Sequence, residues 1–192
     1  YESALHVKRV GAAGPAMLLQ VAMLAWKKVG DRDAAERHFR EIKKTDPGHP
    51  ALVDFYREYH GNKGDPQKLL QTLEQALRLQ TDPARKIEIA IDLARVAEEE
   101  VGNFDKAIEA WKGVLRLVPG KPDAAESLMR LYRKAEKWNA LREMLKQQID
   151  ALPADAVDEK IARYLEMAAI YRDHLKLDVM VVSTYNAILQ LR

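Results

Sequence analysis

The side chains of this sequence that could take part in chemistry are its histidines, one acidic run and a set of widely spaced arginines. The five histidines do not form the H-E-x-x-H spacing of a zinc-dependent hydrolase. The run Glu98-Glu99-Glu100 could hold a cation, but such a run at a helix end is more commonly solvated. Arg57, Arg95 and Arg130 remain, and a planar guanidinium is suited to binding carboxylates through two parallel hydrogen bonds.

Several classes of function are disfavoured by what the 192 residues lack. There is no cysteine, no phosphate-binding glycine motif and no G-x-S-x-G motif, and serines and threonines are few. We therefore predict that the chain is not an enzyme and uses no metal or cofactor. A net charge of +2 argues against nucleic acid as a partner, since that binding needs clustered excess Lys and Arg.

The sequence also bears on location. Membrane spans need about 20 consecutive apolar residues, and no run comes near that length. No secretory signal is visible. The sequence does not determine the compartment, with the cytoplasm favoured and the periplasm as the alternative.

Internal repeats show which elements must position the arginines. Similar turn segments centre on five anchor positions with spacings of 34, 38, 34 and 40 residues. The anchors are Gly30, Gly64, Gly102, Glu136 and Lys176. The last two replace the glycine of the first three, but the surrounding pattern keeps its register.

Downstream of each anchor, apolar residues recur at helical spacing. Five residues on are Ala35, Leu69, Ala107, Leu141 and Val181. Nine residues on are Phe39, Leu73, Trp111, Leu145 and Tyr185. Because steps of four keep these positions on one face, each anchor is followed by an amphipathic helix. Seventeen residues on, the end of the helix is marked in four units by Pro47, Thr81, Pro119 and Pro153.

A second amphipathic helix precedes each anchor. Its aromatic position, four or five residues upstream, holds Trp26, Tyr59, Tyr132 and Tyr171, with Ala97 in the third unit. Units two, three and five carry one extra residue in this helix. Each unit is therefore predicted to be a helix, a turn, a second helix and a link.

This pattern resembles the tetratricopeptide repeat, in which W-x2-L-G-x2-Y is followed by A-x3-F and then P over 34 residues. The first unit carries Trp26, Gly30-Asp31, Ala35, Phe39 and Asp46-Pro47. The resemblance implies an all-α, right-handed superhelical solenoid of antiparallel helix pairs, of the kind found in bacterial multi-repeat arrays. The predicted division of the single solenoid is 1–15 as the remnant of a preceding repeat, then repeats at 16–48, 49–82, 83–120, 121–154 and 155–192.

The resemblance also implies a concave groove lined by the first helix of each unit. At equivalent places in three successive units, Arg57, Arg95 and Arg130 would form a ladder with rungs about 10 Å apart. The other predicted groove residues are His60, Arg133, Lys134, Arg172, Val53 and Ile91. The alternative is that the arginines pair with acids on neighbouring helices, such as Glu58, Asp92 or Glu126, in exposed pairs worth about 0–1 kcal/mol each.

The resemblance thus favours a non-catalytic protein-interaction scaffold, a piece of a longer protein of this type. Its expected partner is a protein or peptide segment, acidic and with apolar anchors. Two alternatives are an RNA-processing scaffold of half-a-TPR repeats and a regulatory repeat segment of a larger enzyme. The uncapped ends of the array also leave oligomerisation open.

Overall fold

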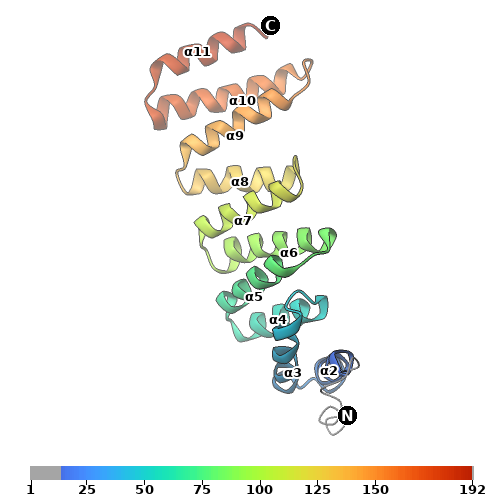
Figure 1. Ribbon diagram of the computed structural model, residues 1–192. Helices are drawn as coiled ribbons and strands as arrows, with labels where there is room; N and C mark the ends of the chain where they lie inside the picture. The colour runs from blue at the N-terminus through green and yellow to red at the C-terminus, as the bar shows by residue number, and fades with distance from the viewer. Residues whose placement is uncertain (1–13, 192) are drawn as a thin grey trace. The chain divides into compact units, whose positions relative to one another are not determined.

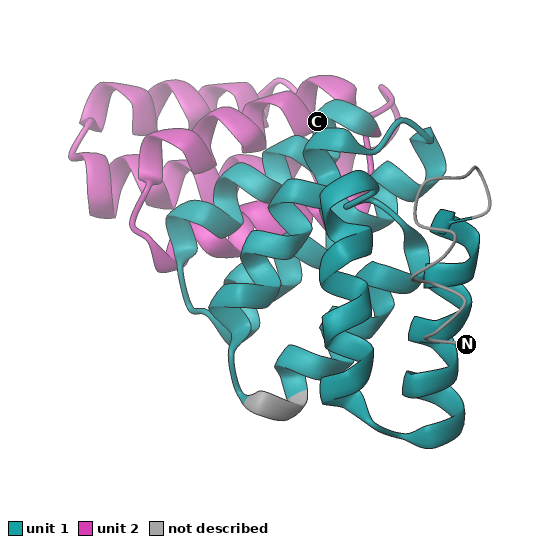
Figure 2. Cartoon of the chain, turned by 60° about the horizontal axis from the view of Figure 1, so that its bottom comes forward, with its two compact units in different colours: residues 1–117 teal, residues 118–192 magenta. Residues whose placement is uncertain are grey.

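The computed structural model describes residues 14–191, apart from the side chains of residues 62 and 63, and this part of the chain contains helices and no strand. Within each of its two compact units, successive helices run back and forth as antiparallel neighbours (Figure 1). The chain divides into two compact units, residues 1–117 and 118–192, and each is described by itself (Figure 2). The predicted all-α class built of helix pairs is confirmed.

Within residues 14–191, unit 1 contains three helix pairs and unit 2 contains two. In unit 1 these are α2 (Gly14–Met23) with the π-helical turn η1 (Leu24–Val29) and α3 (Arg32–Thr45), α4 (Pro50–Lys63) and α5 (Pro66–Leu79), and α6 (Pro83–Arg95) with η2 (Val96–Glu100) and α7 (Phe104–Leu117). In unit 2 they are α8 (Pro122–Lys134) and α9 (Trp138–Ala151), and α10 (Val157–Ala169) with η3 (Ile170–Leu175) and α11 (Asp178–Leu189). The remnant predicted over residues 1–15 lies outside the described residues, except that Gly14 and Pro15 already belong to α2.

All five anchor positions have the same backbone conformation. The φ angles are 76° at Gly30, 63° at Gly64, 68° at Gly102 and 53° at both Glu136 and Lys176. This left-handed conformation ends the first helix of a pair, and glycine adopts it without the steric penalty that a Cβ brings. The anchors read from the sequence therefore share one backbone conformation, which is kept even where glutamate or lysine replaces the glycine.

The residue after the glycine starts the second helix. The Asp31 carboxylate accepts a hydrogen bond of 2.9 Å from the backbone N–H of Ala34. Asp65 and Asn103 accept equivalent bonds from the residues three positions on. Each satisfies one of the backbone donors that a helix N-terminus leaves without a partner. A Gly-Asp or Gly-Asn pair thus ends one helix and caps the next.

Helix ends and π-helical turns follow the repeat as well. The second helices α3, α5, α7 and α9 each end two residues before the position held by Pro47, Thr81, Pro119 and Pro153. A π-helical turn accommodates an inserted residue within a helix. The turns η2 and η3 lie in the third and fifth units, two of the three units in which the sequence indicates an extra residue. The second unit has no such turn, and the first unit has η1 where no extra residue is expected.

The core of unit 1 begins with an aromatic cluster. The rings of Phe39 and Phe55 stack with centroids 4.4 Å apart, and both side chains are fully buried. The Trp26 ring stands edge-on to both, at 6.0 and 5.5 Å. Such aromatic pairs contribute about 0.5–1.5 kcal/mol beyond the area that they bury. These rings join the first two helix pairs.

Candidate partner-binding surface

Ion pairs join the first helices of the second and third pairs, α4 and α6, in unit 1. The Arg57 guanidinium on α4 forms a close ion pair with the Asp92 carboxylate on α6, and its other terminal nitrogen lies 3.7 Å from Asp54. Burial raises the pKa of the Asp92 carboxyl above its ordinary value, while Arg57 and Arg95 act in the opposite direction. For Arg57, the structure therefore shows pairing with an acid on the neighbouring helix.

Arg85 is a second connection between these helices, and the sequence interpretation missed it. Its guanidinium extends from α6 to the Asp54 carboxylate (3.4 Å) and the Pro50 carbonyl oxygen (3.5 Å) on α4. It also donates a hydrogen bond of 2.6 Å to Glu88 on its own helix. Arg57 and Asp92 are 35 residues apart and Arg85 and Asp54 are 31 apart, and each pair joins the first helices of adjacent repeats. Oppositely charged residues on the first helices of adjacent repeats are therefore a better guide than arginines alone.

The remaining predicted residues of unit 1 differ in their exposure. Arg95 is exposed and Ile91 is half-buried on α6. Val53 has no exposed surface, and 8% of His60 is exposed. Val53 and His60 therefore present no side chain to a partner in this structure, and we leave both out of the proposed surface. Leu24, an apolar residue on η1 at the repeat position of Arg57 and Arg95, has 40% of its surface exposed.

His60 instead belongs to the core side of α4. Its ring stacks on Tyr56 with centroids 5.1 Å apart and an angle of 14° between the planes. Burial lowers the pKa of His60, and the nearby lysines Lys43 and Lys68 act in the same direction, while Asp65 and Glu36 oppose them. The neutral imidazole is therefore the favoured form.

Glu58 on α4 connects the second helix pair to the first, as Arg57 connects the second pair to the third. Its carboxylate accepts hydrogen bonds of 3.0 Å from the Trp26 indole N–H and from Arg32 Nε. Lys27 Nζ lies 3.7 Å from the same carboxylate and 3.3 Å from the centre of the Trp26 ring. The hydrogen bond from Arg32 lowers the pKa of Glu58. Two cations, Arg32 and Lys27, thus share one carboxylate at this end of unit 1.

In unit 2 the predicted basic residues lie on α8 and η3. Arg133 on α8 donates to Glu166 on α10, with 3.0 Å between Nε and Oε1. Arg130 and Lys134 are exposed on α8. Arg172 donates two hydrogen bonds, of 2.8 and 2.9 Å, to the adjacent Asp173, and hydrogen bonding from Arg172 lowers the pKa of that carboxyl.

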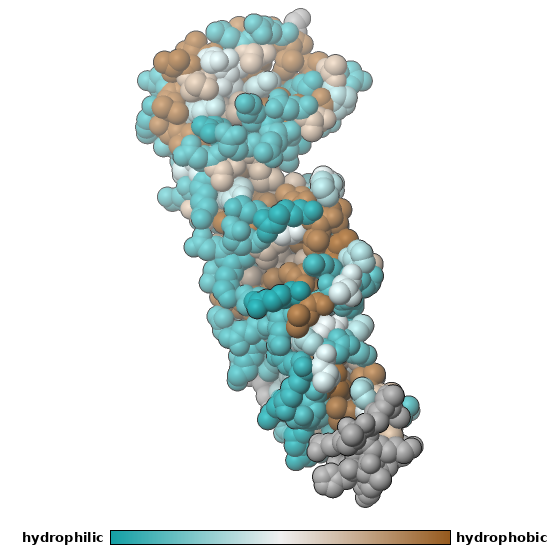
Figure 3. Space-filling model, viewed as in Figure 1, coloured by the Kyte–Doolittle hydropathy of each residue, from teal (hydrophilic) through white to brown (hydrophobic). Residues whose placement is uncertain are grey.

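In unit 2 an apolar residue with accessible surface lies on α10. Leu165 on α10, with 46% exposed, occupies the repeat position that Val53 and Ile91 hold in unit 1. Among the candidate binding residues on the first helices, the exposed ones are therefore mostly charged, with a few apolar neighbours. Figure 3 shows hydrophilic residues over much of one face of the molecule.

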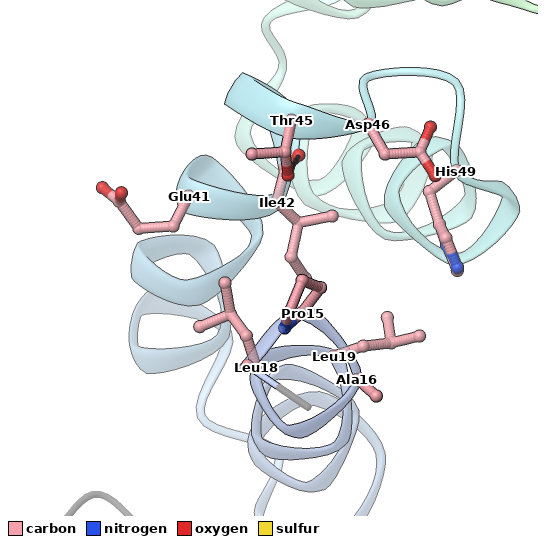
Figure 4. Close-up of a pocket in the computed structure, with 10 residues that line it drawn as sticks. Pro15, Ala16, Leu18, Leu19, Glu41, Ile42, Thr45, Asp46 and His49 are labelled. Atoms are coloured by element: carbon pink, nitrogen blue, oxygen red, sulfur yellow. Dashed lines mark hydrogen bonds between the residues drawn. The ribbon is translucent and has the colours of Figure 1, made fainter. Parts of the chain in front are cut away.

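A cavity of about 460 Å³ lies elsewhere in unit 1, between α2 and α3 (Figure 4). Pro15, Leu18, Leu19 and Ile42 supply its apolar lining, and Glu41, Thr45, Asp46 and His49 supply its polar groups. Among the described residues, no group of three or more His, Asp or Glu side chains could hold a metal ion. Within the same residues, no helix is long and apolar enough to cross a membrane.

Solved structures and a curated sequence resemble this chain. The crystal structure of a MamA protein is 18% identical, with a TM-score of 0.50 over 94% of this chain and 93% of that one. A MamA RS-1 ArsTM double mutant is 13% identical, with a TM-score of 0.50 over 94% and 95%. At these identities the likeness concerns the fold.

The curated relative is the photosystem I assembly protein Ycf3 of Synechococcus sp. (strain CC9902). It is 30% identical over 90 residues, which are 47% of this chain and 50% of the relative, so the match spans about half the length of each. No known protein-family model matches the chain. The repeat register, the left-handed anchors and the helix pairs together give the chain the fold of a tetratricopeptide-type repeat array.

Proposed function

We propose that this chain is a protein-interaction scaffold that binds an acidic segment of a protein partner along the first helices of its repeats. The observation that carries the proposal is the arrangement around Asp92. Arg57 pairs with this half-buried carboxylate from the preceding repeat, and the positive charge of Arg95 also acts on it, which supports a role for the two arginines at one place. The fold and the likeness to an assembly protein support a role in bringing proteins together.

The chemistry of this place favours a carboxylate as the recognised group. Arg57 keeps 44% of its side chain exposed although it is paired, and Arg95 is exposed. A partner carboxylate can therefore share these guanidinium groups with Asp92, or replace it on Arg57. Because Asp92 is half-buried, removing Arg57 from it would leave its charge poorly compensated, so sharing of Arg57 between Asp92 and a partner carboxylate is favoured over replacement.

Apolar contacts would set the position of the segment. Ile91 lies one helical turn before Arg95, and Leu24 and Leu165 occupy related places on η1 and α10. We therefore expect a segment in which Asp or Glu alternates with apolar residues.

The five-repeat division between residues 16 and 192 is part of the proposal, with one described helix pair in each repeat. A regulatory repeat segment of a larger enzyme is the alternative function.

The test is selection of peptides from a random displayed library on the purified chain, followed by anisotropy with the enriched peptides. Enrichment of acidic peptides with apolar residues is expected. A triple charge reversal on first helices should weaken their binding at least about tenfold; it comprises Arg57→Glu, Arg95→Glu and Arg130→Glu. A matched reversal at exposed positions of second helices should leave binding unchanged; it comprises Arg37→Glu, Arg78→Glu and Lys146→Glu. Basic peptides, or equal effects of the two triple variants, would contradict the proposal.

A further inference from the structure

A hollow lies between the second helices α5 and α7 of unit 1, beside the turn η2. Its volume is about 430 Å³, a size common among small-molecule sites. Its walls are α5, α6 with η2, and α7, each of which also packs against a neighbouring helix of unit 1. We call this space the α5–α7 hollow. Its apolar lining consists of Leu70 and Leu77 of α5, Leu93 of α6, Ala97 of η2, and Ala110 and Gly113 of α7.

The equivalent space one repeat earlier is occupied by two tyrosines. Tyr56 and Tyr59 extend from α4 to the second helix α3 of the preceding repeat. The Tyr56 hydroxyl lies 3.4 Å from the Glu36 carboxylate, and the Tyr59 hydroxyl donates a hydrogen bond of 3.0 Å to Asp33. The two rings stand edge-on with centroids 6.3 Å apart. Two large side chains therefore fill this junction between α3 and α4.

The third repeat has alanine at both of these positions. Ala94 and Ala97 stand eight and five residues before the anchor Gly102, at the same distances as the two tyrosines from their own anchor. Gly113 leaves further room, because a Cβ added there would meet only the flexible end of the Arg116 side chain, at 3.7 Å. The α5–α7 hollow therefore exists because this repeat has small side chains where the preceding one has large rings.

The hollow also has apolar side chains where the earlier junction is polar. Lys43 on α3 donates a hydrogen bond of 3.1 Å to the Thr72 hydroxyl on α5. One repeat later these two positions are held by Leu77 on α5 and Ala110 on α7, which both line the hollow. A surface of this kind favours the apolar part of a ligand, because binding removes that surface from water.

The acidic residues of the lining stand beside lysines. Lys106 Nζ on α7 lies 3.0 Å from Glu74 Oε1 on α5, and this ion pair joins the two helices. Asp105 precedes Lys106 in the first turn of α7. Glu109, one turn farther along, pairs with Lys112 at 2.8 Å. An anionic group of a ligand is therefore not expected at this part of the hollow.

The opposite end of the hollow carries an arginine. Arg116, in the last turn of α7, lines the hollow and has no hydrogen bond or ion pair with any residue that the structure describes. Arg78 is exposed in the last turn of α5, at the equivalent position of the preceding repeat. Lys106 and Arg116 are ten residues apart, which is about 15 Å along a helix. An apolar space of about this length therefore ends at a guanidinium group.

We propose that the α5–α7 hollow binds a single-chain aliphatic carboxylate of the fatty-acid type, with its chain along Leu77, Ala97 and Ala110 and its carboxylate on Arg116. A volume of about 430 Å³ spread over about 15 Å has a cross-section of about 30 Å², which suits an extended chain better than a ring system. The guanidinium can bind the carboxylate through two parallel hydrogen bonds. The proposal is independent of the function proposed above, which concerns the first helices.

The test is isothermal titration calorimetry of the full chain with decanoate at pH 7, below the concentration at which decanoate forms micelles. A Kd of about 0.1–1 mM is expected for a ligand of this size. Decyltrimethylammonium has the same chain with a positive head group, so it should bind at least about tenfold more weakly beside Arg116. Nuclear magnetic resonance should locate the site, with decanoate shifting the amide signals of Ala97 and Gly113.

Two variants fill the hollow from different sides. Ala97→Tyr supplies the ring that the second repeat carries as Tyr59, and Gly113→Leu adds a side chain where a Cβ has room. Each should weaken decanoate binding at least about tenfold. Gln75→Leu is the matched control, because Gln75 is exposed at the position of Gly113 in the preceding repeat and does not line the hollow. Its binding should be unchanged, and circular dichroism checks that all three variants fold.

A further variant separates the charge from the space. Arg116→Gln should weaken decanoate binding about 3- to 10-fold without weakening that of decyltrimethylammonium, whereas Arg37→Gln at an exposed position of α3 should change neither. Absence of decanoate binding up to about 5 mM would overturn the proposal. So would equal binding of the two head groups, or binding that both filling variants leave intact. If the filling variants instead weaken only peptides selected from a displayed library, the hollow takes an apolar side chain of a protein and the proposal is wrong.

Discussion

Gly61 and Gly64 lie three residues apart at the end of α4, and the same substitution should have opposite effects on them. Gly61 is within the helix, whereas Gly64 has a φ of +63° and ends it. A Cβ added at either position has no atom within 4 Å to meet. Packing therefore contributes to neither Gly61→Ala nor Gly64→Ala, and the backbone conformation alone decides the result.

The magnitudes follow from the two conformations. Alanine in the left-handed region costs about 1–2 kcal/mol relative to its right-handed form. The stiffer unfolded chain returns about 0.4–1 kcal/mol of this. Gly64→Ala should therefore lower the free energy of unfolding by about 0.5–1 kcal/mol. Gly61→Ala should raise it by about 0.5–1 kcal/mol, the ordinary preference of a helix for alanine. The two variants should differ by roughly 1–2 kcal/mol.

Urea unfolding followed by circular dichroism measures this difference, provided that the denaturant slope is the same in both variants. Stacked repeats can open locally, so hydrogen exchange of the α4 amides is the more direct measurement. Exchange should become faster with Gly64→Ala and slower with Gly61→Ala. A shift of both variants in the same direction would refute the conformational explanation of the anchors.

Two further predictions concern Glu136 and His60. Glu136 occupies an anchor with a φ of 53°, so Glu136→Gly should raise the free energy of unfolding by about 0.5–1 kcal/mol in urea unfolding, and no gain would contradict the strain argument. Burial lowers the pKa of His60 below the 6.5 of an unfolded chain, so its contribution to stability is complete above that value and is lost as pH falls through the folded pKa. His60→Phe, which keeps a ring on Tyr56, should reduce the loss of stability between about pH 7 and pH 5, and an unchanged pH dependence of unfolding would count against this role.

The sequence by itself determined the features that short stretches of chain control. The five anchors follow from residues next to one another, because a left-handed residue and a capping Asp or Asn need only their own backbone neighbours. The ends of α3 and α5, two residues before Pro47 and Thr81, are local in the same way. Local rules act within about one helical turn, so a repeated local pattern reveals the fold class.

Only the tertiary structure decided which side chains meet and which stay in water. The ion pair of Arg57 with Asp92 joins residues 35 positions apart, and its formation depends on how one helix pair stacks on the next. Val53 is buried and Leu165 exposed at equivalent places of the repeat. Tyr185 holds a core position by sequence and is exposed on α11. Burial is a property of the neighbours that cover a residue, and periodicity within one helix does not specify those neighbours.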